Sequence, residues 1–313
     1  MCPITEGEVA FDVPQAGKTC KTFYKVLGEL GSGPTLIALH GGPGAGHEYL
    51  APLADLWKQP YGIPTVLYDQ IGCGRSTHFR EKIYDEEFWS FDLFIRELDN
   101  LIDQLNLRDG GFYVIGQSWG GVLAATYAMR HPKGLQKLVI SSGPASMSLY
   151  IEGLKGLLTQ LPTDVRKTLE DCDREGDHES EAFRKAAKVF NHMFVCRLDP
   201  LPEEVQAGYK NLKEDSTVYL TIQGPAEFVI IGSIRGWEGW KEGHKINVET
   251  LLVNGKNDEV TSLSMYPWFK TIPKVRWVTL DGAHHSHWED RKRYIQEVGD
   301  FLSSTTPNDR REL

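Results

Sequence analysis

A serine lies in a short glycine-rich stretch of the chain, Gly116-Gln117-Ser118-Trp119-Gly120-Gly121. The apolar run 112–115 comes before this stretch, and the helix-like run 122–129 comes after it. A serine in a tight turn between a strand and a helix is typical of a nucleophile, because its hydroxyl lies at the helix N-terminus, where the dipole favours a developing negative charge. The flanking glycines suit such a turn, since side chains there would crowd the strand and the helix. The stretch alone does not exclude an ordinary glycine-rich turn.

Two residues that could act with this serine follow the last two predicted strands. Asp258 comes after the strand-like run 248–253, and His284 comes after the run 275–280. In a catalytic triad, His284 would take the proton of the Ser118 hydroxyl, and Asp258 would orient the imidazole and stabilise its charged form. The order serine, aspartate, histidine along the chain is that of α/β-hydrolases and not that of chymotrypsin or subtilisin. We therefore predict Ser118 as a nucleophile, with Asp258 and His284 as its partners.

A second glycine-rich loop, His40-Gly41-Gly42-Pro43-Gly44, follows the apolar run 35–39. Ligands of open α/β sheets bind outside the carboxyl ends of the strands, and a glycine-rich loop there lets backbone N–H groups approach a substrate oxygen closely. We expect the backbone N–H groups of Gly42 and Trp119 to form an oxyanion hole.

The elements that must position these residues follow from the hydrophobic pattern. Alternating sequence predicts an N-terminal hairpin from 8–13 and 19–27. Apolar residues spaced three and four apart between Phe91 and Leu105 predict a helix in front of the strand that precedes Ser118. Mainly apolar runs predict buried strands at 35–39, 64–68, 112–115 and 136–140. Strands that alternate with helices predict right-handed βαβ units, and hence a mostly parallel central sheet with helices on both faces.

The character of the sequence changes between about residues 145 and 245, where apolar strands give way to charged, helix-like sequence. We interpret 145–245 as a helical cap inserted into an α/β-hydrolase fold, whose core is formed by 1–144 and 246–313. A helix is expected from Asp290 to about Leu302, and the polar tail from Ser303 is expected to fray.

Composition limits the classes of function. The 313 residues are 41% hydrophobic and 25% charged, which is ordinary for a globular protein, and no apolar run approaches the roughly 20 residues that span a bilayer. The net charge of −9 argues against nucleic acid as a partner. The first residues lack a basic segment followed by an apolar one, so we expect a cytoplasmic location. The five cysteines are scattered and odd in number, which favours free thiols.

Three neighbouring histidines, His284, His285 and His287, raise the question of a metal site. No further ligand pattern such as H-E-x-x-H accompanies them, so we expect no metal, and His285 and His287 are interpreted as solvated or hydrogen-bonded neighbours of His284. Trp237 and Trp240 suit either the lining of a substrate pocket or a buried core, and the sequence does not distinguish the two.

Taken together, these motifs resemble the prolyl iminopeptidase family of α/β-hydrolases, which includes the tricorn-interacting aminopeptidases and the L-amino acid amidases. The resemblance covers nearly the whole chain and is weakest from residue 145 to about residue 220. The segments that carry it are 40–44, 69–76, 116–121, Gly224-Pro225-Ala226-Glu227-Phe228, Asp258-Glu259-Val260-Thr261, and His284 with Trp288-Glu289-Asp290.

The resemblance implies a cap over the active site and the release of an N-terminal residue, often proline, from small peptides or amides. It also implies two acidic residues that bind the free α-amino group of the substrate, and the matching positions are Glu227 and Glu259. Carboxylates suit this task because they distinguish a charged amino terminus from an acylated one.

We therefore predict a serine hydrolase of the aminopeptidase or amidase type that acts without a cofactor on a small peptide, an amino acid amide or a small ester. The alternative is an esterase, lactonase or amidase that uses the same triad on a small metabolite. A binding protein on a hydrolase scaffold is a third class, but a matched nucleophile and base argue against it. Neither nucleic acid nor a membrane is expected as a partner, and the side-chain preference and oligomeric state stay open.

Overall fold

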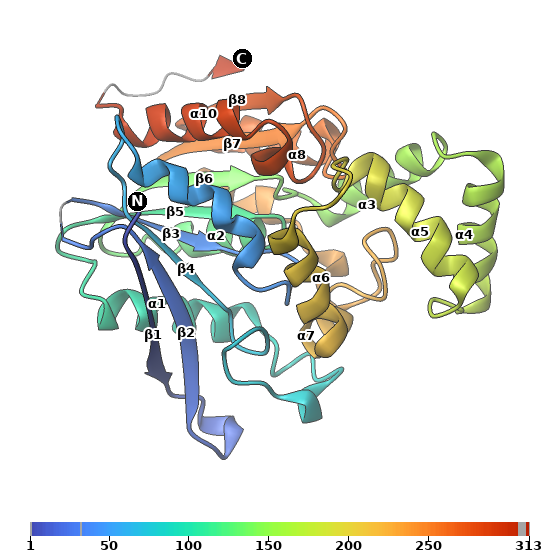
Figure 1. Cartoon of the computed structure of the whole chain (residues 1–313), viewed down its shortest axis with the longest axis horizontal. Coiled ribbons are helices and arrows are strands. Elements are labelled where there is room, and N and C mark those ends of the chain that lie inside the picture. Colours follow the sequence, from blue (N-terminus) through green and yellow to red (C-terminus); the bar gives the residue numbers. More distant parts are fainter. Residues whose placement is uncertain (1, 32, 306–310, 313) are drawn as a thin grey trace.

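The computed structural model describes residues 2–31, 33–305 and 311–312. Its strands are β1 (Ile4–Phe11), β2 (Cys20–Leu27), β3 (Thr35–Leu39), β4 (Thr65–Tyr68), β5 (Phe112–Gln117), β6 (Leu135–Ser141), β7 (Glu249–Gly255), β8 (Val275–Leu280) and β9 (Arg311–Glu312). They form one sheet in the order β1-β2-β4-β3-β5-β6-β7-β8-β9 (Figure 1). The pairs β1·β2 and β2·β4 are antiparallel, and every later pair in this order is parallel.

Alternating residues of the central strands face opposite sides of the sheet, and both sides are covered. In β3, Ile37 and Leu39 pack into one core, whereas Leu36 and Ala38 pack into the other. The first core lies beneath α1 (Phe91–Gln104), α2 (Trp119–Ala128) and α8 (Ser262–Thr271). The second lies beneath the 3-10 helix η2 (Glu48–Trp57) and α10 (Arg291–Ser303). Burial on both faces explains the continuous apolar runs, and the predicted α/β class with a mostly parallel sheet is confirmed.

The predicted N-terminal hairpin is confirmed. β1 and β2 pair from Ile4 opposite Leu27 to Phe11 opposite Cys20, and the 3-10 helix η1 (Pro14–Ala16) lies in the connection.

The chain end differs from the sequence-based expectation. α10 ends at Ser303, close to where it was predicted to end, but Arg311–Glu312 pairs in parallel with β8 and is not a free tail. A sheet edge presents unpaired N–H and C=O groups, and this short strand satisfies some of those of β8. Residues 306–310, which also belong to the predicted tail, lie outside the described residues.

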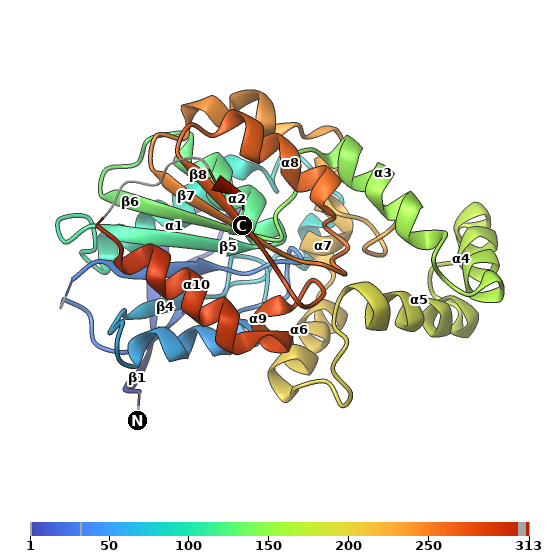
Figure 2. The same cartoon turned by 90° about the horizontal axis from the view of Figure 1, so that it is seen from above.

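Between Ser141 and Glu249 the chain leaves the sheet in a segment, residues 142–248, that we call the helical excursion. Its helices are α3 (Met147–Leu158), α4 (Thr163–Glu175), α5 (Glu181–Phe194), α6 (Glu203–Glu214) and α7 (Thr217–Ile222), followed by the 3-10 helices η4 (Ser233–Gly236) and η5 (Gly239–Lys245). In both views α4 and α5 extend away from the sheet (Figures 1 and 2). The excursion returns to the core where α3 packs against α8 and α6 packs against η2. No helix in the described residues has the length and apolar character needed to cross a bilayer.

Local sequence explains why α5 forms and how it is oriented. The Ser180 hydroxyl accepts a hydrogen bond from the Phe183 backbone N–H at 3.2 Å and so caps the helix N-terminus. Its buried residues recur at spacings of three and four, which gives the helix one apolar face. These residues are Phe183, Ala186, Phe190 and Phe194.

Parallel pairing places the carboxyl ends of β3, β5, β7 and β8 at the same edge of the sheet. The loops that follow these strands contain Gly42, Ser118, Asp258 and His284 respectively. Residues far apart in the sequence therefore meet at one edge.

The close approach of α2 to the sheet can be tested at Gly120. A Cβ atom at this position would lie 2.1 Å from the backbone oxygen of Leu39, so the backbone would have to move. We expect Gly120→Ala to lower the free energy of unfolding by roughly 3 kcal/mol, measured by urea denaturation. Gly156→Ala is the control, because a Cβ atom there meets nothing within 4 Å and the better helix propensity of alanine adds up to about 1 kcal/mol. Equal unfolding midpoints for the two variants would contradict the steric argument.

Candidate active site

Ser118 occupies a strained turn between β5 and α2. Its backbone angles are φ 59° and ψ −124°, in a region that residues with a side chain rarely adopt. Three backbone hydrogen bonds hold it there: the Ser118 N–H donates to the Ser141 oxygen at 2.9 Å, and the Ser118 oxygen accepts from the N–H groups of Gly121 at 2.8 Å and Val122 at 3.2 Å. A Cβ atom at Gly116 would lie 1.9 Å from the Gly120 oxygen, so this turn requires glycine. The side chain of Ser118 stays partly exposed.

His284 and Asp258 lie together beside this turn. His284 Nδ1 is 2.8 Å from Asp258 Oδ1, and both side chains are buried. Three further groups donate to the Asp258 carboxylate: the Ser142 hydroxyl at 2.6 Å, the Val260 N–H at 2.8 Å and the Gly255 N–H at 3.2 Å. Such donors stabilise a charged carboxylate, which is the form that orients an imidazole.

Ser118 itself is not hydrogen-bonded to His284 in this arrangement. Among the described residues no hydrogen bond joins the Ser118 hydroxyl to another side chain, and His284 Nε2 instead lies 3.5 Å from Glu259 Oε1. The imidazole is therefore held between two acids, with Asp258 at Nδ1 and Glu259 at Nε2.

Glu259 is a buried acid with unused hydrogen-bonding capacity. It is 1% exposed, and its Oε2 atom has no hydrogen-bond partner among the described residues. Burial, together with the nearby carboxylates of Glu227 and Asp258, raises the pKa of Glu259 well above its usual range, and His284 and a hydrogen bond with Tyr150 oppose this shift only in part. A bound cation in addition to His284 would relieve the repulsion between the carboxylates of Glu259, Glu227 and Asp258.

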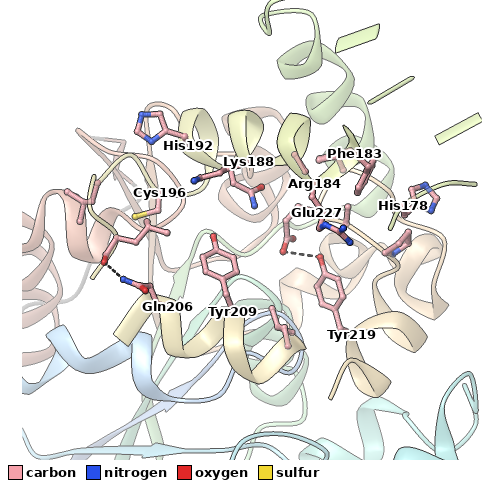
Figure 3. A pocket seen from close by; sticks show the side chains of 18 of the residues that line it. His178, Phe183, Arg184, Lys188, His192, Cys196, Gln206, Tyr209, Tyr219 and Glu227 are labelled. Atoms are coloured by element: carbon pink, nitrogen blue, oxygen red, sulfur yellow. Dashed lines mark hydrogen bonds between the residues drawn. The ribbon is translucent and has the colours of Figure 1, made fainter. Parts of the chain in front are cut away.

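Glu227 approaches the same place from the helical excursion. Its Oε1 atom accepts a hydrogen bond from the Tyr219 hydroxyl at 3.0 Å, which fixes the carboxylate (Figure 3). Burial raises the pKa of Glu227, and His284 and the Tyr219 hydrogen bond oppose this shift only in part. The structure thus brings together all five side chains that the sequence predicts for catalysis and amino-group binding, Ser118, Asp258, His284, Glu227 and Glu259.

The acids outnumber the basic group, and this changes the ionisation of His284. Burial by itself lowers the pKa of an imidazole, but the carboxylates of Asp258, Glu259 and Glu227 outweigh it and raise the pKa of His284 to about 9. With no cation bound between the acids, His284 is therefore protonated at neutral pH.

The two predicted oxyanion donors lie in the same place as Ser118. Gly42 and Trp119 both border pockets that contain Ser118, and within the described residues neither backbone N–H donates to another protein atom. The neighbouring N–H of Gly41 is already used, because it donates to the Tyr49 hydroxyl at 2.6 Å, which in turn donates to Gln117 Oε1 at 2.7 Å.

Three hollows meet at this site. The nucleophile pocket is bordered by Gly42, Gln117, Ser118, Tyr209, Leu212, Glu227, His284 and His285, among others. The inner pocket is bordered by Ser118, Trp119, Met147, Tyr150, Glu227, Ile234 and Val260, among others. The outer cavity has a volume of about 800 Å³ and is lined by His178, by residues of α5 and α6, by Tyr219 of α7, and by residues of the segments 196–201 and 225–228. The outer cavity is the largest of the three and does not contain Ser118, but it shares Tyr209, Leu212 and Glu227 with the nucleophile pocket.

Trp237 and Trp240 border none of the three hollows, and the Trp237 ring packs 5.9 Å from that of Trp268.

Sequence reasoning missed the hydroxyl groups that hold the site. Ser142 supports Asp258, Tyr219 supports Glu227, and Tyr49 links the two loops around Ser118. None of these residues belongs to a short motif with a defined spacing, so no local signal distinguishes them from other serines and tyrosines.

The histidines next to His284 were expected to be solvated or hydrogen-bonded; both are buried, so they are not solvated, and the hydrogen-bonded alternative is confirmed for His287. His287 is 1% exposed and its Nε2 atom lies 3.1 Å from the Tyr49 backbone oxygen, while the His285 ring stacks on the Tyr49 ring at 5.3 Å. Burial lowers the pKa of His287 to about 3, so it stays neutral. These rings pack beneath the site and keep charge out of that region.

One group in the described residues, His47, Glu48 and Asp69, brings three possible metal ligands close together. Asp69 Oδ1 already accepts hydrogen bonds from the N–H and the Nδ1 atom of His47, and its Oδ2 accepts one from the Arg75 N–H at 2.8 Å. This group braces two loops, and its Asp69 oxygens are already satisfied.

Comparison with known proteins gives consistent matches. Residues 34–291 match a family model described as alpha/beta hydrolase fold. The sequence is 34% identical to the proline iminopeptidase of Saccharolobus solfataricus over 281 residues, and this match covers 90% of this chain and 88% of that protein. The crystal structure of VinJ matches with a TM-score of 0.90 and 36% identity over 96% of this chain and 99% of that chain. The proline iminopeptidase structure from Mycobacterium smegmatis matches with a TM-score of 0.82 and 32% identity over 94% and 97% of the two chains.

The ionisation of His284 can be measured directly. We expect the imidazole to titrate near pH 9 in the free protein, followed by NMR of ring-labelled histidine. Glu227→Gln removes one of the acids that stabilise the imidazolium, so the pKa of His284 should fall. Glu152→Gln, at an exposed position of α3, is the control and should leave the pKa where it is. The same His284 pKa in both variants would contradict the influence of Glu227.

Proposed function

The chain belongs to the proline iminopeptidase family of α/β-hydrolases, and from this we propose that it releases the N-terminal residue of short peptides or amino acid amides. Membership of this family makes it a serine hydrolase of the peptidase type. The observation that carries the finer proposal is the pair of acids Glu227 and Glu259, which lie beside Ser118 and His284 and, with Asp258, outnumber the one cation there.

In the first half of the proposed reaction, Ser118 Oγ attacks the carbonyl carbon of the N-terminal residue and its proton passes to His284 Nε2. The backbone N–H groups of Gly42 and Trp119 hold the negative oxygen of the tetrahedral intermediate. The C–N bond then breaks, His284 gives its proton to the leaving nitrogen, and the acyl group stays on Ser118 as an ester.

In the second half, a water molecule gives a proton to His284 and attacks the ester carbon. The C–O bond to Ser118 breaks, the proton returns to Ser118 Oγ, and the free amino acid leaves. Asp258 is the acid of the triad in this proposal, because it lies at Nδ1 and leaves Nε2 as the nitrogen that takes the serine proton. Glu259 approaches Nε2 and so cannot serve as the orienting acid in the same geometry.

We propose that Glu227 and Glu259 hold the substrate ammonium. An ammonium donates up to three hydrogen bonds, and Glu259 Oε2 has an unused acceptor for one of them. The bound cation would also draw Glu259 away from His284 Nε2 and lower the pKa of His284, so that the imidazole becomes a base when substrate is present. Binding and activation are thereby coupled.

The inner pocket suits the side chain of the released residue. Its wall includes Trp119, Met147, Ile234 and Val260, so a small or apolar side chain such as that of proline fits its chemistry. In this proposal residues 145–245, which make up most of the helical excursion, form the cap domain. Residues 1–144 and 246–313 form the catalytic core. The proposed partners are small peptide, amide or ester substrates.

The role of Ser118 is tested by Ser118→Ala. The kcat of the variant on a prolyl arylamide should fall by about 10⁴- to 10⁶-fold, because the nucleophile is gone. For the same reason the variant should not react with a fluorophosphonate probe. Ser262→Ala, at an exposed position of α8, is the matched control and should keep both properties. Wild-type activity in a correctly folded Ser118→Ala protein would refute the proposed mechanism.

Recognition of the amino group is tested by acylating it. An N-acetyl group removes the cation and leaves Glu227 and Glu259 facing each other, and the loss of one partner of a buried charge pair costs about 2–5 kcal/mol. We expect kcat/KM for a prolyl arylamide to exceed that of its N-acetyl form by at least roughly 30-fold. Glu227→Gln should bring the two values closer together, and Glu152→Gln should preserve the wild-type ratio.

Equal kcat/KM values for the free and acetylated substrates on the wild-type enzyme would exclude recognition of the amino group. That outcome would favour the alternative, a hydrolase for a small metabolite ester or lactone that uses the same triad.

A further inference from the structure

The outer cavity is much larger than the proposed chemistry of a simple amide requires. Its volume of about 800 Å³ lies within the roughly 300–1,000 Å³ of pockets that enclose drug-sized ligands. Release of ammonia or of a single small amine would leave most of this space unused. The cavity therefore points to a larger group on one side of the scissile bond.

The leaving group is the part of the substrate that lies towards this cavity. The leaving nitrogen receives its proton from His284, so it must lie next to His284, which borders the nucleophile pocket and not the inner pocket. The nucleophile pocket meets the outer cavity at Tyr209, Leu212 and Glu227. A leaving group that extends from His284 thus passes directly into the outer cavity.

The charges of the outer cavity are separated. Glu227 lies at the end shared with the nucleophile pocket, whereas Arg184 and Lys188 line the cavity from α5 (Figure 3). They are four residues apart, so their side chains leave the helix on the same side. In the figure α5 lies across the cavity from Tyr209 and Tyr219.

These two cations are not neutralised by nearby acids. Arg184 donates to the backbone oxygen of Glu179, and no carboxylate in the described residues forms an ion pair with Arg184 or Lys188. Asp199 is the other acid of the lining, and it belongs to the segment 196–201 and not to α5. The cavity thus presents a carboxylate at its inner end and positive charge on α5.

A free peptide has the matching distribution of charge, with an ammonium at one end and a carboxylate at the other. We propose that the outer cavity binds the leaving part of a short peptide and that Arg184 and Lys188 receive its C-terminal carboxylate. This inference rests on the proposed function, because it takes Glu227 and Glu259 as the site of the N-terminal ammonium. It narrows the substrate class from peptides and amides to short peptides with a free C-terminus.

The test compares peptides that differ only in the charge of the C-terminus. Pro-Ala, Pro-Ala-Ala and Pro-Ala-Ala-Ala are prepared as free acids and as C-terminal amides, and kcat/KM is measured for each at low ionic strength. Exposed ion pairs contribute modestly, so we expect the free acid to be preferred by about 3- to 10-fold at the length whose carboxylate reaches α5. The preference should shrink in 1 M salt, where screening is strong.

Charge reversal identifies the cations responsible. Lys188→Glu should abolish the preference for the free acid, and the double variant with Arg184→Glu should reverse it. Lys185→Glu is the matched control, since Lys185 lies on the same helix, is 77% exposed, pairs with Glu181 and does not line the cavity. Lys185→Glu makes the same change in net charge as Lys188→Glu and should keep the wild-type preference for the free acid.

The outcomes separate this inference from the function on which it rests. A wild-type enzyme that hydrolyses prolyl arylamide but shows no preference for the free acid at any of the three lengths would overturn the inference alone. A preference that survives in the double variant, or that Lys185→Glu removes equally, would also overturn it. Failure of the wild-type enzyme to hydrolyse any substrate with a free amino terminus would instead overturn the proposed function.

Discussion

The active site depends on a backbone contact between β5 and α2. A Cβ atom at Gly116 would lie 1.9 Å from the backbone oxygen of Gly120 in α2, and one at Gly120 would lie 2.1 Å from the backbone oxygen of Leu39 in β3. This approach forces the chain to reverse sharply at Ser118, whose positive φ costs of the order of 1–3 kcal/mol. The surrounding sheet and helix compensate for that cost, because both are buried in a large core. The result is a partly exposed hydroxyl at the N-terminus of a helix, and the oxyanion donors and the triad that we propose are arranged around it.

A second constraint is electrostatic. Three carboxylates surround one imidazole in a region from which water is largely excluded, so the acids of the free site outnumber its one cation, His284. Glu259 shows this most directly, since one of its oxygens is buried without a partner. Such an arrangement is unfavourable for an isolated protein and favourable for one that binds a cation. The substrate ammonium that we propose would complete the site, and the same step would return His284 to its neutral form.

The two parts of the chain contribute differently to this site. Loops of the sheet supply Ser118, Asp258 and His284 from elements that are rigidly held by parallel pairing. The helical excursion supplies Glu227 and the walls of the outer cavity. The proposed triad thus comes from the sheet loops alone, whereas the proposed amino-group site joins both segments, because Glu259 follows β7 and Glu227 belongs to the helical excursion. In a fold of this kind, substitutions in the inserted helices can change the substrate preference without disturbing the backbone of the turn that contains Ser118.

The sequence alone determined the features that depend on neighbouring residues: the strands with apolar runs, the glycines around Ser118, and the position of each candidate residue after a strand. The outer cavity and the hydroxyl groups that hold the acids could not be predicted, because they arise between segments far apart in the chain. Ser142 and Asp258, for example, are 116 positions apart, and no spacing in the sequence connects them. The burial of His285 and His287 and the strand Arg311–Glu312 were missed for the same reason. Local patterns specify backbone conformation, whereas the ionisation and partners of a side chain depend on which distant groups the fold packs around it.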